Sequence, residues 1–132
     1  MRIQVKDFMS TPVTTAIGED SVHDIRTLMK EKGIHAIPII SYTNDKLKVE
    51  ITIRGIVTAT DLNKVVHENT TIDDVMTSSN VYVVHVDSSA QAAAKMMLRY
   101  NVHHLVVMEE GDIKGMISSL DFVKLVAEHS LG

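Results

Sequence analysis

Two segments of the chain, GIVTATD at 55–61 and GMISSLD at 115–121, have the same spacing of chemically useful residues. In each, a hydroxyl residue follows a glycine by three positions and an aspartate follows the hydroxyl by three. A hydroxyl at the beginning of a helix can donate to a phosphate oxygen, and the free N–H groups there favour an anion. A carboxylate one turn later can accept from the vicinal hydroxyls of a ribose. The pattern therefore suits a nucleotide.

The same pattern also has an explanation that needs no ligand. Ser or Thr followed three residues later by an acidic residue is close to a capping box, which stabilises the beginning of a helix. For Thr58 and Asp61 alone, capping would be the better interpretation. Because Ser118 and Asp121 repeat the pattern with similar flanking residues, nucleotide binding is favoured.

The repetition extends along the whole chain, which predicts an internal duplication. The first copy has eight extra residues between Ile40 and Gly55, which we expect to form a longer hairpin loop. The duplication predicts one repeat over 1–68 and a second over 69–132, with a short linker near 67–71. Three pairs of segments match: 6–11 with 73–78, 21–40 with 89–108, and 55–66 with 115–126.

Each copy must position its Thr/Ser–Asp pair with the same set of elements. A helical turn comes first, then a short strand at about 12–16 or 81–86, rich in β-branched residues in the second copy. A helix follows, which in the first copy begins at a Ser21–Asp24 capping pattern and ends at Gly33. Two strands joined by a turn and a last amphipathic helix complete a β-α-β-β-α order.

This order predicts an α+β (α/β) fold, with one parallel and one antiparallel strand pair in each copy. A unit of roughly 60 residues buries too little surface to be comfortably stable alone. We therefore expect the two β-α-β-β-α repeats to pack sheet to sheet about a pseudo-two-fold axis. Two similar clefts would result.

Composition excludes several classes of protein. The net charge is −4 with no basic run, and aromatic residues make up 4% of the chain, so a nucleic-acid partner is not expected. No apolar run reaches the roughly 20 residues of a membrane helix. The chain has no cysteine, which excludes disulfides and thiol nucleophiles and favours a cytoplasmic location.

The duplicated unit, with its strands GIHAIPI at 33–39 and NVHHLVV at 101–107 and the two Gly-x-x-Thr/Ser-x-x-Asp segments, resembles a tandem pair of CBS domains. The resemblance covers nearly the whole chain. It implies a non-catalytic regulatory module that requires no cofactor and binds an adenosine-containing ligand such as AMP, ADP, ATP or S-adenosylmethionine. It also implies a homodimer formed through helices and signalling to a partner protein.

The resemblance also implies a role for particular residues. Asp61 and Asp121 would hold ribose hydroxyls, and Thr58 and Ser118 would contact ribose or phosphate. Arg and Lys residues are expected to be sparse near the clefts, which argues against a triphosphate. The middle strands would line the adenine, the first strands would close its pocket, and histidines would contact phosphate. These further residues are Ile37, Pro38, Leu105 and Val106; Thr14, Thr15, Tyr82 and Val83; and His35, His103 and His104.

Two other functions compete with the sensor. Ser118, His103 and Asp121 could form a hydrolytic set, but the equivalent residues recur in the first copy, as duplicated binding clefts would predict. We therefore expect no catalytic residue. Neighbouring residues of a strand point to opposite faces, so His103 and His104 are not expected to bind one metal ion, and no metal site is predicted. The alternative to the sensor is an interaction scaffold with empty clefts.

Overall fold

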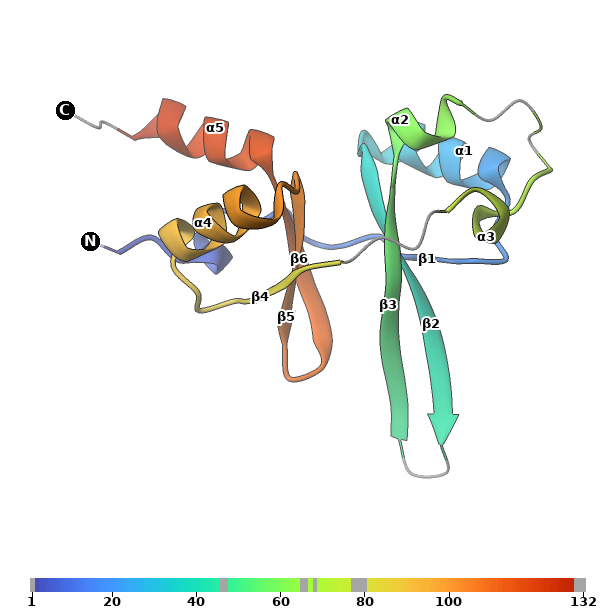
Figure 1. The fold of residues 1–132 in the computed structure, drawn as a ribbon, viewed down its shortest axis with the longest axis horizontal. Helices are drawn as coiled ribbons and strands as arrows, with labels where there is room; N and C mark the ends of the chain where they lie inside the picture. Colours follow the sequence, from blue (N-terminus) through green and yellow to red (C-terminus); the bar gives the residue numbers. More distant parts are fainter. Residues whose placement is uncertain (1, 46–47, 65–66, 68, 77–80, 130–132) are drawn as a thin grey trace. The chain divides into compact units, whose positions relative to one another are not determined.

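The computed structural model describes residues 2–45, 48–64, 67, 69–76 and 81–129 (Figure 1). The chain divides into two compact units, each built around a three-stranded sheet. The unit of residues 14–81 contains the first sheet, and we call it the first-repeat unit. The unit that joins residues 1–13 to 82–132 contains the second sheet and is the second-repeat unit.

The first-repeat unit has the strand order β1-β2-β3. Strand β2 pairs in parallel with β1 and antiparallel with β3. Helix α1 begins where the Ser21 side chain accepts from the Asp24 N–H, and it ends at Gly33, whose φ of 64° suits glycine. The elements are β1 (Ala16–Ile17), α1 (Val22–Lys32), β2 (Ala36–Asp45), β3 (Lys48–Thr58), α2 (Ala59–Leu62) and α3 (Ile72–Val75).

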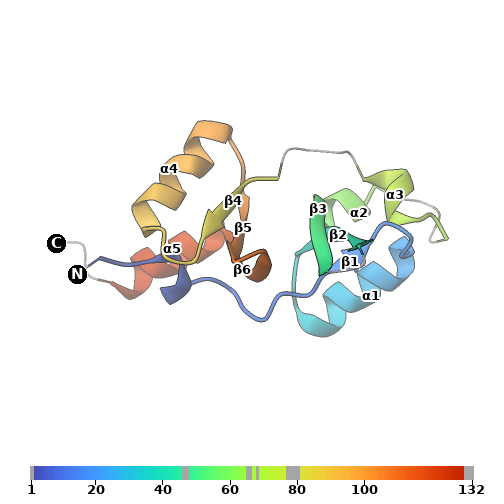
Figure 2. The same ribbon diagram turned by 90° about the horizontal axis from the view of Figure 1, so that it is seen from below.

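The second-repeat unit repeats this topology with the strand order β4-β5-β6. Helices α4 and α5 lie on the same side of this sheet (Figures 1 and 2). Apolar side chains between the sheet and α4 form the core, among them Leu105 and Ile117, which are fully buried. The elements are the 3-10 helix η1 (Val5–Asp7), β4 (Val83–His85), α4 (Ala90–Tyr100), β5 (His104–Glu109), β6 (Asp112–Ser118) and α5 (Ser119–Glu128).

The two β-α-β-β-α repeats and the α+β class are confirmed. Three local expectations were wrong. The first strand is Ala16–Ile17 rather than 12–16, because only these two residues pair with β2. The extra residues of the first copy lengthen β2 and β3, whose ladder runs out to Asp45 and Lys48, rather than adding a loop. Helix α2 is four residues long where an amphipathic helix was expected.

The segment before each repeat packs in the unit of the other repeat. The first leader (residues 2–13) joins the second-repeat unit: Val5 N–H donates to Ser88 O at 2.8 Å, and Ser10 exchanges two hydrogen bonds with Met116. The second leader (residues 69–76) joins the first-repeat unit, where Asp73 N–H donates to Gly18 O at 2.9 Å. The compact units therefore differ in membership from the sequence repeats, and the division at residue 68 stays a prediction.

In each unit, a methionine of the leader packs over a glycine of the last strand: Met9 over Gly115, and Met76 over Gly55. A Cβ atom on Gly115 would lie 2.5 Å from Met9 Sδ and 3.0 Å from the carbonyl oxygen of Ser10. A Cβ atom on Gly55 would lie 2.9 Å from Met76 Sδ. At Gly115 an added side chain would therefore meet the backbone of the first leader, whereas at Gly55 it would meet only the flexible side chain of Met76.

Candidate functional site

The first candidate site lies where β3 ends and α2 begins. Thr58 N–H donates to Asp61 Oδ2 at 3.0 Å, and Asp61 N–H donates to Thr58 Oγ1 at 3.2 Å, which is a complete capping box. Asp61 is exposed. Among the interactions of the described residues, the second carboxylate oxygen, Oδ1, has no partner. Capping therefore uses one oxygen of Asp61 and leaves the other open to a ligand hydroxyl.

The second candidate site repeats this geometry where β6 passes into α5. Ser118 N–H donates to Asp121 Oδ2 at 2.8 Å, and Asp121 N–H donates to Ser118 Oγ at 3.3 Å. Here the carboxylate is half-buried, and the Ser10 hydroxyl of the first leader lies 3.5 Å from Asp121 Oδ1. The two sites have the same type of turn, but Asp61 is exposed whereas Asp121 is half-buried.

The hydrolytic set considered from the sequence does not form a hydrogen-bonded chain among the described residues. His103 Nδ1 lies 3.2 Å from the hydroxyl of Ser119, the neighbour of Ser118. The Ser118 hydroxyl instead accepts from the backbone of Asp121. A nucleophile needs a base within hydrogen-bond reach, and Ser118 makes no such contact with His103 in this structure.

The predicted adenine-lining residues of the first repeat lie beside one edge of β2. Pairing between β1 and β2 begins at Ala16 and Ile39, so Thr14 and Thr15 precede the paired residues of β1, and Ile37 and Pro38 precede those of β2. Ile37 and Pro38 are buried, and both pair with β3 on the other side. Their main chain is therefore the part of them that a ligand could contact.

The corresponding edge in the second repeat is more closed. Val106 N–H donates to Tyr82 O at 3.1 Å, which extends the pairing of β4 with β5 by one residue. The Tyr82 ring stacks on Tyr100 with ring centroids 4.1 Å apart. Leu105 and Val106 are buried in β5, and the Val83 side chain is exposed.

The histidines before the middle strands connect those strands to the candidate turns. The carbonyl of His35 accepts from Ala59 N–H at 2.9 Å, and the carbonyl of His103 accepts from Ser119 N–H at 3.0 Å. Both side chains are exposed, whereas His104 is half-buried. The structure therefore brings His35 next to the Thr58–Asp61 turn and His103 next to the Ser118–Asp121 turn.

A pocket of about 330 Å³ opens beside the first candidate site, between the C-terminal half of α1 and α2. Its lining includes the basic residues Arg26, Lys30 and His35, and no acidic residue. Arg26 Nη2 donates to the carbonyl of Leu62, which holds this side chain against α2. The expectation that Arg and Lys are sparse near the site is wrong for the first repeat, because α1 folds back over it. Asn63 and the apolar residues Met29, Gly33, Ile34, Ala59 and Leu62 complete the lining.

Arg26 and Lys30 were not among the residues predicted from the sequence, although their spacing of four residues places them on one face of a helix. The matching positions of the second copy carry no charge. By the alignment of 21–40 with 89–108, Arg26 corresponds to Ala94 and Lys30 to Leu98. Leu98 is 82% exposed. The two repeats therefore present different chemistry at equivalent places.

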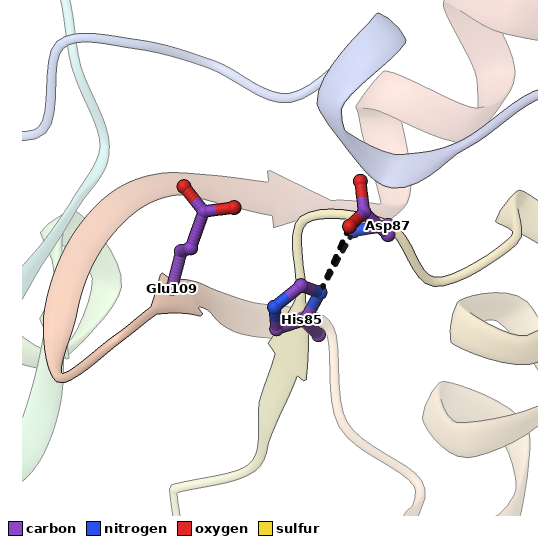
Figure 3. A group of neighbouring side chains, drawn as sticks. All are labelled: His85, Asp87 and Glu109. Atoms are coloured by element: carbon purple, nitrogen blue, oxygen red, sulfur yellow. Dashed lines mark hydrogen bonds and ion pairs between the residues drawn. The ribbon is translucent and has the colours of Figure 1, made fainter.

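A second group of polar residues lies at the far end of β4 and β5. Figure 3 shows His85, Asp87 and Glu109, which each offer a ligand atom within 4.8 Å of the others. Asp87 N–H donates to His85 Nδ1 at 3.1 Å, and Lys6 Nζ lies 2.9 Å from Asp87 Oδ1. The hydrogen bond between Lys6 and Asp87 raises the pKa of Lys6 and lowers the pKa of Asp87. Asp87 therefore already forms an ion pair with Lys6 of the first leader. The absence of a metal site stays a prediction.

Comparison with known proteins gives a consistent result. The profile of the CBS domain matches residues 5–68 and again residues 72–128. An inosine-5′-monophosphate dehydrogenase from Korarchaeum cryptofilum is 32% identical over 119 residues, which are 89% of this chain and 23% of that protein. A homoserine O-acetyltransferase from Methanosalsum zhilinae is 30% identical over 129 residues, which are 96% of this chain and 25% of that protein. The chain thus spans about a quarter of the length of these relatives.

Solved structures resemble the chain over nearly its full length. The CBS domain pair of protein MJ0100, crystallised with 5′-methylthioadenosine and S-adenosyl-L-methionine, has a TM-score of 0.78 at 26% identity. The match covers 97% of this chain and 98% of that one. An acetoin utilization protein from Vibrio cholerae shares the fold, with a TM-score of 0.74 at 24% identity over 97% of this chain and 93% of that one. Within the described residues, no helix is long and apolar enough to cross a membrane.

Proposed function

This chain belongs to the CBS domain family as a tandem pair, a regulatory module, and on that premise we propose that it binds an adenosine-containing ligand and transmits the binding to a partner protein. The observation that carries the proposal is the pair of turns at Thr58–Asp61 and Ser118–Asp121. In the first, a capping aspartate keeps one oxygen open beside a pocket of about 330 Å³.

Each predicted contact has a physical basis in this arrangement. The open Asp61 Oδ1 can accept from ribose hydroxyls while Oδ2 holds the helix start. The adenine would lie against the main chain of Ile37 and Pro38, where β2 has no partner from β1. The solved relative with 5′-methylthioadenosine and S-adenosyl-L-methionine supports this class of ligand.

The module itself is proposed to carry no reaction and to require no cofactor. The relatives named as enzymes match over about a quarter of their length, which supports a regulatory role for the matched part. Signalling would then follow from a difference in ligand affinity between two arrangements of the chain or of its partner.

Thermal unfolding with a panel of ligands tests the proposal. A ligand at about 100 times its Kd adds about 2.7 kcal/mol to the folded state, which raises the unfolding midpoint by several degrees. We expect that rise with at least one of AMP, ADP, ATP, adenosine, 5′-methylthioadenosine or S-adenosylmethionine. GMP and GTP serve as matched controls and should give no rise. If no adenosine compound shifts the midpoint, the scaffold with empty clefts is the better function.

We also propose that the chain forms a homodimer through its helices. Helix α5 has no buried residue, and three of its apolar side chains, Leu120, Val123 and Val126, are more than half exposed. Exposed apolar residues grouped on one element are typical of an interaction site. Replacing Val123 by glutamate should weaken the dimer by at least tenfold in sedimentation equilibrium. Lys124→Glu, on the same helix, is the control, and a wild-type monomer at high concentration would contradict the proposal.

A further inference from the structure

The two repeats differ in charge at the place where a phosphate group would lie. In the first repeat, the pocket between α1 and α2 is lined by Arg26, Lys30 and His35, without an acidic residue. Its volume of about 330 Å³ falls in the usual range for small-molecule sites, about 300–1,000 Å³. Three basic groups around one cavity favour an anion, and hydrogen bonds from charged donors to phosphate are among the stronger ones in proteins.

The pocket lies next to the candidate ribose site, because its lining includes Ala59 and Leu62, the chain neighbours of Thr58 and Asp61. His35 lines the pocket, and its carbonyl accepts from the N–H of Ala59, which also lines the pocket. Ala59 directly follows Thr58, whose partner Asp61 offers the open carboxylate oxygen. A ribose held by Asp61 would therefore have its 5′ substituent within reach of the basic pocket.

The second repeat has the equivalent turn and histidine, since the carbonyl of His103 accepts from Ser119 N–H, but it lacks the two cationic side chains of the helix. Ala94 and Leu98 replace Arg26 and Lys30, and Val123 replaces Asn63 in the aligned copy. Leu98 and Val123 are largely exposed to solvent. Asp121 is half-buried with the Ser10 hydroxyl 3.5 Å from its Oδ1. At the positions of Arg26 and Lys30, an anionic ligand would meet the apolar side chains of Ala94 and Leu98.

We propose that the first repeat is the site for a phosphorylated adenosine ligand, with Lys30 and His35 contacting the phosphate, and that the second repeat does not select for phosphate. This inference rests on the proposed function, because it assigns the phosphate of the same class of ligand. It also makes the two sites unequal, so that a single chain distinguishes a nucleotide from an unphosphorylated nucleoside at one position only.

Isothermal titration with AMP and with adenosine tests the inference. Wild-type protein should bind AMP about tenfold or more tightly than adenosine, and the ratio should fall in high salt because salt screens exposed charges. Lys30→Leu, which installs the residue type of the second repeat, should reduce AMP affinity about three- to tenfold and leave adenosine affinity unchanged. Lys30 is exposed, so the variant is expected to fold, and circular dichroism checks this.

A matched control separates the outcomes. Lys95→Leu removes the same charge from α4 of the second-repeat unit and should leave both affinities unchanged. Equal affinity for AMP and adenosine in wild-type protein, or a Lys30→Leu variant with the wild-type ratio, would overturn the inference while the proposed function stands. If neither AMP nor adenosine nor any other ligand of the panel binds, the proposed function itself is overturned.

Discussion

Replacing Asp61 by alanine should reduce the affinity for AMP roughly ten- to a hundredfold. The Asp61 carboxylate is exposed and keeps Oδ1 free among the described contacts, while Oδ2 accepts from Thr58 N–H at 3.0 Å. Hydrogen bonds to a charged group contribute about 1.5–3 kcal/mol, which corresponds to this range of affinity when the ribose hydroxyls lose their acceptor. Isothermal titration of the variant measures the loss directly.

The same substitution also removes a helix cap, so a matched control is needed. Losing a capping side chain costs about 0.5–2 kcal/mol of stability. Asp7 forms the equivalent capping box with Gln4 at the beginning of η1, where Gln4 N–H donates to Asp7 Oδ2 at 2.8 Å. Asp7→Ala should lower the unfolding temperature and leave AMP affinity unchanged. If Asp61→Ala binds AMP as well as Asp7→Ala does, Asp61 is a helix cap and nothing more.

The repeated fold was predictable because its signals are local and occur twice. The turn at Ser118 and Asp121 forms from residues three apart, so the capping geometry follows from sequence spacing alone. Both ends of the helix after Ser21 could be predicted from residue type, because serine is a common N-cap and Gly33 a common helix end. Duplication then fixes the order of elements in the other copy.

Other parts of the fold depend on partners that lie far away in the sequence. Residues 12–15 have a β-branched composition, but β1 begins only at Ala16 because strand pairing requires a partner in β2. The extra residues of the first copy could equally have been a loop. They are strand because β2 and β3 continue to pair beyond Ile40.

The candidate site was predicted in part for the same reason. The Thr58–Asp61 turn is local and was found, whereas the basic pocket combines α1 with α2, separated by the whole β2-β3 hairpin. The grouping of His85 with Glu109 was missed because it depends on the parallel register that pairs His85 with Met108. The register between two strands that are distant in the sequence cannot be predicted from residue spacing.

Because each leader packs in the unit of the other repeat, a core substitution in one unit should release the leader of the other repeat. Leu105 and Ile37 are fully buried in the cores of the second-repeat and first-repeat units, respectively. Replacing either by alanine should lower the free energy of unfolding by about 2–5 kcal/mol, because each leaves a cavity. The two variants should differ in which leader they release.

Amide hydrogen exchange measured by mass spectrometry distinguishes them. Leu105→Ala should speed exchange in the first leader, because Val5 and Ser10 donate their N–H groups to Ser88 and Met116 of the weakened unit. It should leave the second leader at its wild-type rate, since Ile72 and Asp73 bond within the first-repeat unit. Ile37→Ala should give the reverse pattern, and each variant is the control for the other.

The contrary outcome is equally specific. If each variant released the leader that belongs to its own sequence repeat, the compact units would follow the division at residue 68 instead of the hydrogen bonds of the leaders. If both variants released both leaders equally, the chain would unfold as one cooperative unit. Because each leader carries a methionine over a glycine of the other repeat, at Gly115 and at Gly55, the exchanged pattern is the one that the packing requires.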